Sequence, residues 1–264
     1  MRRNVTAHLT IDVTSPSELA MSIGAASRSG DIDERLDVRL DGAPLHARVI
    51  GDAHGTRLHA IGADVGLLTI DYAATIEGRE PPAPSVPRDL IRYLRPSRYC
   101  ESDELAATAN AEFGGLTGHS LLSGVSSWVG TRLEYVSGSS LPTDGAVRTL
   151  LARRGVCRDY AHLCVALLRA SGVPARLVSV YAPGLSPMDF HAVCEAHVEG
   201  EWCVVDATAL APRTSLVRIA TGRDAADTAF MTVVSGHAEL IELAVSAVVD
   251  ALPHDDLMDA IHLG

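Results

Sequence analysis

The apolar residues of this chain change their spacing once, on either side of a proline-rich stretch at residues 77–90. Before that stretch, from Asn4 to about Ile76, short runs such as RLDVRL and LLTIDYAATI alternate apolar with polar residues. Alternation with a period of two is typical of strands that bury one face. Several such strands in succession, separated by turn residues, predict an N-terminal β-sandwich domain over residues 1–80.

The stretch EGREPPAPSVPRDL contains four prolines. Proline lacks the amide hydrogen that a β-ladder needs, and it favours extended, solvated backbone. We therefore expect residues 81–98 to connect two parts of the chain, either as a linker or as a strap that crosses from one domain to the other.

After the prolines the apolar residues follow a helical spacing. In SLLSGVSSWVGTRL they form one stripe, and in TDGAVRTLLARRG we expect Thr143 to cap a helix that ends at Gly155. The segment CRDYAHLCVALLRASG predicts a further helix that begins at or near Cys157, and VPARLVSVY predicts a strand after it. Residues 99–264 are thus expected to form a second, helix-containing domain. The stripe consists of Leu121, Leu122, Val125, Trp128 and Val129.

The segments HAVCEAHVE and WCVVDAT, joined at Gly200, predict a β-hairpin. If its turn has two residues, His191 and Asp206 lie diagonally on one face of the hairpin. A three-residue turn would reverse this arrangement. With the two-residue turn, the opposite face is the core side, and it consists of Ala192, Cys194, Ala196, Val198, Cys203 and Val205.

The charge of the chain limits its partners. The formal net charge is -11, and no basic stripe is present, so we expect no nucleic-acid partner. No apolar run approaches membrane-spanning length, and MRRNVTAHLTIDV alternates like a strand rather than like a signal peptide. The expected location is therefore cytoplasmic, with no membrane partner.

Cysteine has two possible roles here. The chain has five cysteines without regular spacing, which favours free thiols, and we expect neither a metal site nor a cofactor. An isolated cysteine is usually a small buried residue, and we interpret Cys164, Cys194 and Cys203 in this way. Cys157 differs because it begins a helix, where a thiolate is favoured. A nucleophilic thiol also needs a base and a group that orients the base, and His191 and Asp206 fit those roles.

Three blocks, GVCRDYAHLCVALLRASGVPARLVSVYA, DFHAVCEAHVEGEWCVVDAT and IATGRDAADTAF, resemble the bacterial transglutaminase-like family. The resemblance covers roughly residues 90–240. It implies a papain-like α+β core, with helices packed on an antiparallel sheet, after an N-terminal β-sandwich. It also implies that Cys157 is the nucleophile, that His191 is the general base and acid, and that Asp206 orients the imidazole. The chain departs from the family pattern at Val193 and Ala207, beside these residues, which puts substrate preference in doubt more than chemistry.

Supporting residues are less clearly marked. Papain-like proteases use a glutamine in the oxyanion hole, and this chain contains no glutamine. The Cys157 backbone N–H is the first candidate donor, and Trp128 and Tyr135 are candidate side-chain donors. Asp159 is expected to stabilise the first turn of the helix or to help order the site. His162 is interpreted as a packed or capping histidine, and GRDAAD (222–227) as a salt-bridged loop over the catalytic domain.

The predicted function is thiol-dependent acyl transfer on amide or related carbonyl substrates through a covalent acyl-enzyme at Cys157. One alternative is a cysteine peptidase or amidase that hydrolyses the same intermediate with water. Another is a non-catalytic binding module. The expected substrate is a peptide or protein amide, with a small amine as one acceptor. Because the chain has no lysine and no glutamine, it cannot crosslink itself by the glutamine–lysine route, and a GC-rich genome would explain the absence of both.

Overall fold

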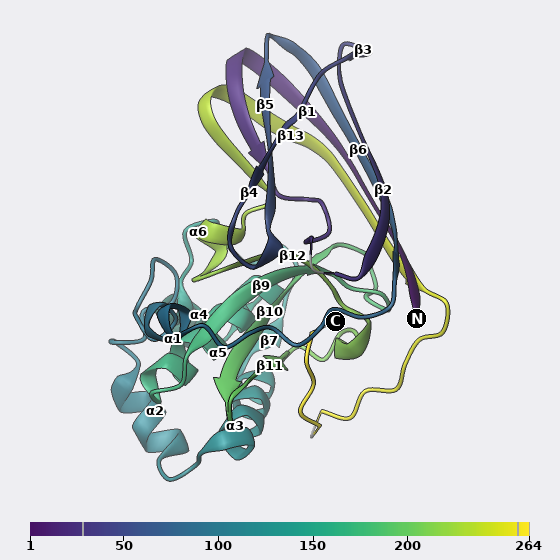
Figure 1. Cartoon of the computed structure of the whole chain (residues 1–264). Coiled ribbons are helices and arrows are strands. Elements are labelled where there is room, and N and C mark those ends of the chain that lie inside the picture. Colours follow the sequence, from purple (N-terminus) through teal and green to yellow (C-terminus); the bar gives the residue numbers. More distant parts are fainter. Residues whose placement is uncertain (28, 258, 264) are drawn as a thin grey trace.

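The computed structural model describes residues 1–27, 29–257 and 259–263. A long sheet occupies the upper half of Figure 1, and helices with a smaller sheet occupy the lower half. Among the described residues, no helix is both long and apolar enough to cross a bilayer. The strands of the long sheet are β1 (Arg2–Met21), β2 (Asp31–Leu40), β3 (Ala43–Pro44), β4 (Arg48–Gly51), β5 (Arg57–Ala63), β6 (Gly66–Glu77) and β13 (Met231–Val249).

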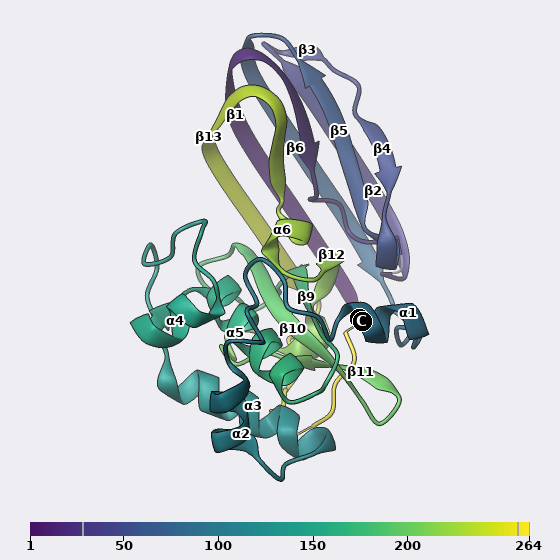
Figure 2. The same cartoon turned by 90° about the vertical axis from the view of Figure 1, so that its left-hand side faces the viewer.

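The strand β1 organises the long sheet. Along one edge it pairs antiparallel with β13, and along the other it pairs first with β6 and then, from Ser17 to Met21, with β5. All seven strands belong to one hydrogen-bonded sheet, whose path is β3-β2-β6-β1-β5-β4 with β13 on β1. The predicted sandwich is therefore realised only in part. The strands share one apolar core, as expected, but hydrogen bonds join them into one continuous sheet, in which β1 and β13 bend together at the top of the molecule (Figures 1 and 2).

The predicted boundary of the second domain is wrong at its C-terminal end. Residues 99–264 were expected to form that domain, but β13 lies in the N-terminal sheet, beside β1 in both views (Figures 1 and 2). The pairing extends from Arg3 opposite Val249 to Met21 opposite Met231. Unpaired N–H and C=O groups along such a strand would be costly, and β13 satisfies this edge of β1.

The connecting segment is a strap that is anchored by a few side chains. Most of residues 81–98 are exposed, but Asp89 and Tyr93 are buried, as is Glu80 just before them, and a short helix, α1 (Pro87–Arg92), forms where extended backbone was expected. Proline is compatible with this helix because Pro87 occupies its first turn, where an amide hydrogen has no partner. The short 3-10 turn η1 (Ala53–Gly55) follows β4.

The remaining elements form the lower half of the molecule. An antiparallel four-stranded sheet has the order β11-β10-β9-β12, and β7 pairs parallel with β8. The helices are α2 (Ala106–Phe113), α3 (Gly118–Arg132), α4 (Ala146–Ala152), α5 (Cys157–Ala170) and α6 (Ala225–Thr228), with the 3-10 turn η2 (Arg213–Ser215). The strands are β7 (Glu134–Tyr135), β8 (Arg154–Gly155), β9 (Ala175–Tyr181), β10 (Phe190–Val198), β11 (Glu201–Val205) and β12 (Val217–Gly222).

Two predicted helix ends are wrong. The N-cap of α4 is Gly145 rather than Thr143, and the helix ends at Arg153, which adopts a left-handed conformation. Gly155 instead pairs with Tyr135 between β7 and β8. This change matters for the site because the β7–β8 pair lies directly before α5.

The α5 helix covers one face of the four-stranded sheet and shares an apolar core with α3. The stripe Leu121, Leu122, Val125 and Val129 is buried in this core, as predicted. The other face of the sheet is also buried, because Val193 and Val204 belong to a second apolar cluster. In addition, Tyr181, Val217 and Ile219 belong to the core of the N-terminal sheet, so the two halves share packed surface.

Candidate active site

Cys157 begins α5, as the sequence predicted. It is half-buried, whereas Cys100, Cys164, Cys194 and Cys203 are buried, and all five are free thiols. The carboxylate of Asp159 accepts the Val156 backbone N–H at 2.8 Å and the Ser140 hydroxyl at 2.9 Å. Asp159 therefore stabilises the first turn of α5, and this fixes the position of the Cys157 side chain at the start of the helix.

The hairpin has a two-residue turn, which is the first of the two alternatives that the sequence left open. Val198 pairs with Glu201 and Cys194 with Val205, so the register has the expected parity. His191 Nε2 lies 3.0 Å from Asp206 Oδ2, and both side chains are buried. The other Asp206 oxygen, Oδ1, accepts hydrogen bonds from the Thr208 N–H at 2.9 Å and from its hydroxyl at 2.7 Å. Asp206 is thus held against rotation while it orients the imidazole.

The charges of His191 and Asp206 stabilise each other. Burial alone would lower the pKa of His191, but the charge and hydrogen bond of Asp206 outweigh burial and raise that pKa to about 10, with a further contribution from Cys157. Burial would raise the pKa of Asp206, but His191 and Thr208 hold it below its usual value. An imidazolium beside a carboxylate is the expected form of this pair at neutral pH.

The thiol and the imidazole meet in one cleft. Cys157 and His191 both line a cavity of about 310 Å³. Among the described residues, His191 Nδ1 has no hydrogen-bond partner, whereas Nε2 is engaged by Asp206. The ring therefore has one nitrogen fixed by the carboxylate and one free to exchange a proton with a thiol or a substrate. The structure brings the predicted Cys157, His191 and Asp206 together.

The two candidate side-chain donors have different positions. Tyr135 lies beside Cys157: burial, followed by the charge of Cys157, raises the pKa of Tyr135 to about 12, and a hydrogen bond from the Cys157 main chain acts in the opposite direction. Trp128 is wrongly predicted as a donor. Its indole N–H donates to Glu112 at 2.8 Å, and its ring packs against Phe113 on the helical side of the molecule.

Two other sequence interpretations are confirmed. His162 is buried, its Nε2 accepts the Ala225 N–H at 3.1 Å, and burial lowers its pKa to about 3, so it is a packed histidine. In the GRDAAD loop, Arg223 pairs with Asp227 at 2.9 Å. Asp224 caps α6 by accepting the N–H of Ala226.

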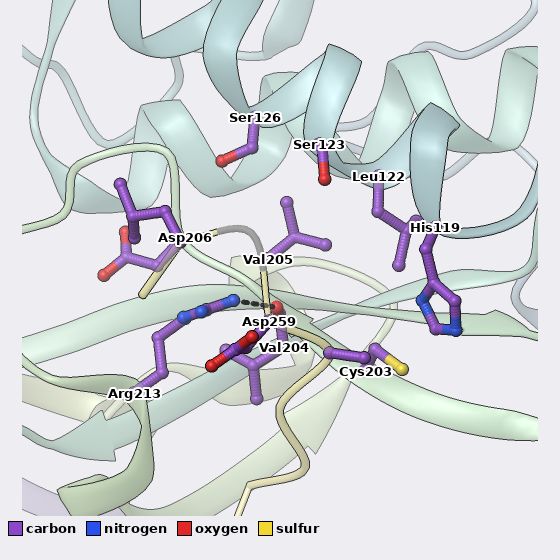
Figure 3. Close-up of a pocket in the computed structure, with 12 residues that line it drawn as sticks. His119, Leu122, Ser123, Ser126, Cys203, Val204, Val205, Asp206, Arg213 and Asp259 are labelled. Carbon is purple, nitrogen blue, oxygen red and sulfur yellow. Dashed lines mark hydrogen bonds between the residues drawn. The ribbon is translucent and has the colours of Figure 1, made fainter. Parts of the chain in front are cut away.

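A second pocket lies behind Asp206. Figure 3 shows Asp206 and Arg213 on one side of it, with Ser123 and Ser126 of α3 above them. Arg213 donates to the Val204 carbonyl at 3.4 Å and forms an ion pair with Asp255 at 2.9 Å. These contacts hold the C-terminal segment across β11. Sequence reasoning missed Arg213 because its partner is 42 positions away.

Sequence reasoning also missed most of the cleft lining. Asp189 lines the cleft beside His191, and burial raises its pKa. Met231 and Leu243 come from β13, a strand that the sequence patterns did not predict. Asp189 precedes the FHA block and could have been noticed, but no local pattern shows that β13 reaches the cleft. Within the described ranges, no three His, Cys, Asp or Glu side chains converge as a metal site would require.

Comparison with known proteins identifies the group to which these features belong. The family model described as the transglutaminase-like superfamily matches residues 107–207. The crystal structure of a "putative cysteine protease" from Cytophaga hutchinsonii superposes with a TM-score of 0.89 at 34% identity, covering 98% of this chain and 95% of that one.

Two curated mycobacterial relatives match over shorter stretches. An uncharacterized protein of Mycobacterium tuberculosis is 44% identical over 61 residues, which is 23% of this chain and 19% of the relative. An uncharacterized protein of Mycobacterium leprae is 39% identical over 54 residues, which is 20% of this chain and 19% of the relative. The matches span about a fifth of the length of these relatives.

Proposed function

Because the chain belongs to the transglutaminase-like superfamily, we propose that it is a cysteine enzyme that transfers acyl groups from amides or related carbonyl compounds. The observation that carries the proposal is the convergence of Cys157 with the buried His191–Asp206 pair in one cleft. A surface thiol without such a pair has no group to receive or return a proton.

In the first half-reaction, the Cys157 sulfur attacks the carbonyl carbon, and a C–S bond forms while the C=O electrons move to oxygen. The tetrahedral intermediate then collapses, the C–N bond breaks, and His191 gives its proton to the leaving amine. Asp206 does not change its protonation state. It keeps Nε2 of the imidazole engaged so that Nδ1 faces the reacting atoms.

The negative oxygen of the intermediate needs donors close to Cys157. We propose the Cys157 N–H and the Tyr135 hydroxyl, because both lie beside the sulfur and Tyr135 keeps its proton at neutral pH, its pKa being raised to about 12 by burial and by Cys157. The first N–H groups of a helix have no intrahelical acceptor, and the Cys157 N–H donates to the Tyr135 oxygen instead, so in this proposal the substrate oxygen takes the place of that acceptor.

The acceptor in the second half-reaction decides the name of the enzyme. Water gives a peptidase or amidase, and an amine gives transamidation. The description of the Cytophaga protein as a putative cysteine protease supports water as the acceptor. A glutamine peptide incubated with the enzyme and a labelled small amine distinguishes the two. Ammonia release without incorporation of the label identifies hydrolysis, and incorporation identifies transamidation.

The thiol can be tested without knowing the substrate. At pH 6 a free cysteine with a pKa near 8.5 is only about 0.3% thiolate, so iodoacetamide alkylates it slowly. We expect Cys157, paired with His191, to react at pH 6 at least about tenfold faster than glutathione, as followed by peptide mass spectrometry. The four buried cysteines are poor references because burial alone would protect them.

The matched variants are Cys157→Ala, which should abolish the adduct, and His191→Ala, which should slow alkylation at pH 6 to about the glutathione rate. Circular dichroism shows whether each variant keeps its fold. If Cys157 reacts no faster than glutathione in the wild-type protein, the chain is a binding module rather than an enzyme. The proposed partners are a peptide or protein amide and a small amine acceptor, and the cytoplasmic location stays a prediction, tested by cell fractionation.

A further inference from the structure

The cleft that holds Cys157 and His191 has an apolar wall that the chemistry at these residues does not require. Proton transfer and attack on a carbonyl need polar groups, yet much of the lining of the 310 Å³ cavity is hydrocarbon. The apolar side chains come from both halves of the molecule. They are Leu177, Phe190, Ile219, Phe230, Met231 and Leu243.

The part of this wall that comes from β13 belongs to the long N-terminal sheet. Met231 is paired with Met21, and Leu243 with Leu9, in the β1–β13 ladder. The carbonyl of Phe230 accepts the Ser22 backbone N–H at 2.9 Å, which holds the entry to β13 against β1. The N-terminal sheet thus presents fixed apolar side chains to the thiol of the other half.

The charged groups of the cleft are already engaged or weakly suited to ligands. The Arg158 guanidinium donates to the Ser140 hydroxyl and to the Leu141 carbonyl at 2.6 Å. Asp189 accepts the Phe190 N–H at 2.7 Å, and its carboxylate already interacts with the charge of the neighbouring His191. The cleft therefore offers an incoming charged side chain little compensation for its lost hydration.

Two hydroxyl groups of the lining lack partners. Among the described residues, the Ser22 and Ser179 hydroxyls are buried and make no hydrogen bond. Ser22 is only 2% exposed. Both oxygens lie beneath the cleft surface, out of reach of a bound ligand, so they add no polar contact to the apolar wall.

We propose that this wall is the acyl-donor subsite and that it selects a peptide whose side chain next to the attacked carbonyl is large and apolar, of leucine, methionine or phenylalanine size. The N-terminal sheet then has a role in specificity, because Met231 and Leu243 form the part of the subsite contributed by β13. This inference rests on the proposed function, since it assigns the donor of the same acyl transfer.

The test uses N-blocked aminoacyl chloromethyl ketones with the side chains of glycine, leucine, phenylalanine, lysine and glutamate. In each reaction the Cys157 sulfur forms a C–S bond with the methylene carbon, the C–Cl bond breaks, and chloride leaves. Rates of adduct formation at Cys157 are measured by mass spectrometry and divided by the iodoacetamide rate of the same protein. We expect leucine and phenylalanine probes to react roughly tenfold or more faster than the glycine probe, and the lysine and glutamate probes no faster than glycine.

The variants are Leu243→Ala and Met231→Ala, each of which should reduce the leucine-to-glycine ratio by about threefold to tenfold. The matched control is Val234→Ala, on the same strand but 65% exposed, which should leave the ratio within about twofold of wild type. Ratios within one protein do not depend on the folded fraction of each preparation.

Each outcome is decisive. A lysine or glutamate probe that reacts fastest, or a glycine probe as fast as leucine, overturns the apolar subsite. Ratios unchanged in both Leu243→Ala and Met231→Ala overturn the role of the N-terminal sheet. If iodoacetamide itself reacts with Cys157 no faster than with glutathione, the proposed function has failed instead.

Discussion

Replacement of Asp206 by asparagine is the sharpest test of the electrostatics of the site. Asparagine has nearly the same shape, so the substitution removes the charge next to His191 while the packing is largely retained. Without that charge, burial lowers the pKa of His191 and only Cys157 opposes it, so we expect this pKa to fall well below about 10. In the variant, His191 therefore loses its proton at a much lower pH than in the wild type.

The expected loss in unfolding free energy follows from the same interaction between Asp206 and His191. Breaking a buried ion pair costs roughly 3–5 kcal/mol, and neutralisation of His191 in the variant favours the lower value, about 3 kcal/mol at pH 7. The folded pKa of His191 is raised, so its stabilising contribution is complete below pH 6.5 and is lost as the pH rises through about 10. The folded pKa of Asp206 is lowered, so the stability that this carboxylate contributes is present at neutral pH and is lost as the pH falls through that folded pKa.

The assay is urea unfolding of both proteins at pH 7, 8, 9 and 10. We expect the difference in unfolding free energy to shrink by about 1 kcal/mol per pH unit across this range. The chain has no lysine, and the cysteine and tyrosine side chains that titrate in this range are common to both proteins. The matched control is Asp71→Asn, which removes the partner of His8 in an exposed pair at 2.7 Å and should cost less than about 1 kcal/mol. A difference that stays constant from pH 7 to pH 10 would refute the charge interaction between Asp206 and His191.

Three further substitutions probe other parts of the structure. Glu195→Gln leaves the buried guanidinium groups of Arg176 and Arg218 without their shared carboxylate, and urea unfolding should show a loss of roughly 3–5 kcal/mol. Tyr135→Phe removes the proposed second oxyanion donor and should lower the rate of acyl-enzyme formation by about tenfold to a thousandfold, with little change in iodoacetamide labelling. Trp128→Phe removes an indole N–H that is bonded to the surface carboxylate of Glu112, and it should leave the rate of acyl-enzyme formation within about twofold of wild type. If Tyr135→Phe and Trp128→Phe lower this rate equally, the position assigned to Tyr135 is contradicted.

The chemical centre could be predicted to a large extent from local patterns. The start of α5 at Cys157 follows from a helical period that begins after Gly155, and the proximity of His191 and Asp206 follows from strand parity and a two-residue turn. Each of these depends on residues within about fifteen positions of one another. Sequence reasoning failed for the Trp128 side chain because only tertiary packing determines which face of α3 meets the sheet and which meets Glu112.

The sequence by itself determined which residues can form the thiol, imidazole and carboxylate set, since hydrophobic period and turn length control local geometry. Tertiary structure alone decided what surrounds that set. The pairing of β13 with β1 joins residues more than 200 positions apart, and it follows from the need of a long strand to satisfy its second edge, which no local period encodes. Because of that pairing, Met231 and Leu243 reach the cleft, and the N-terminal sheet becomes part of the surface that faces Cys157.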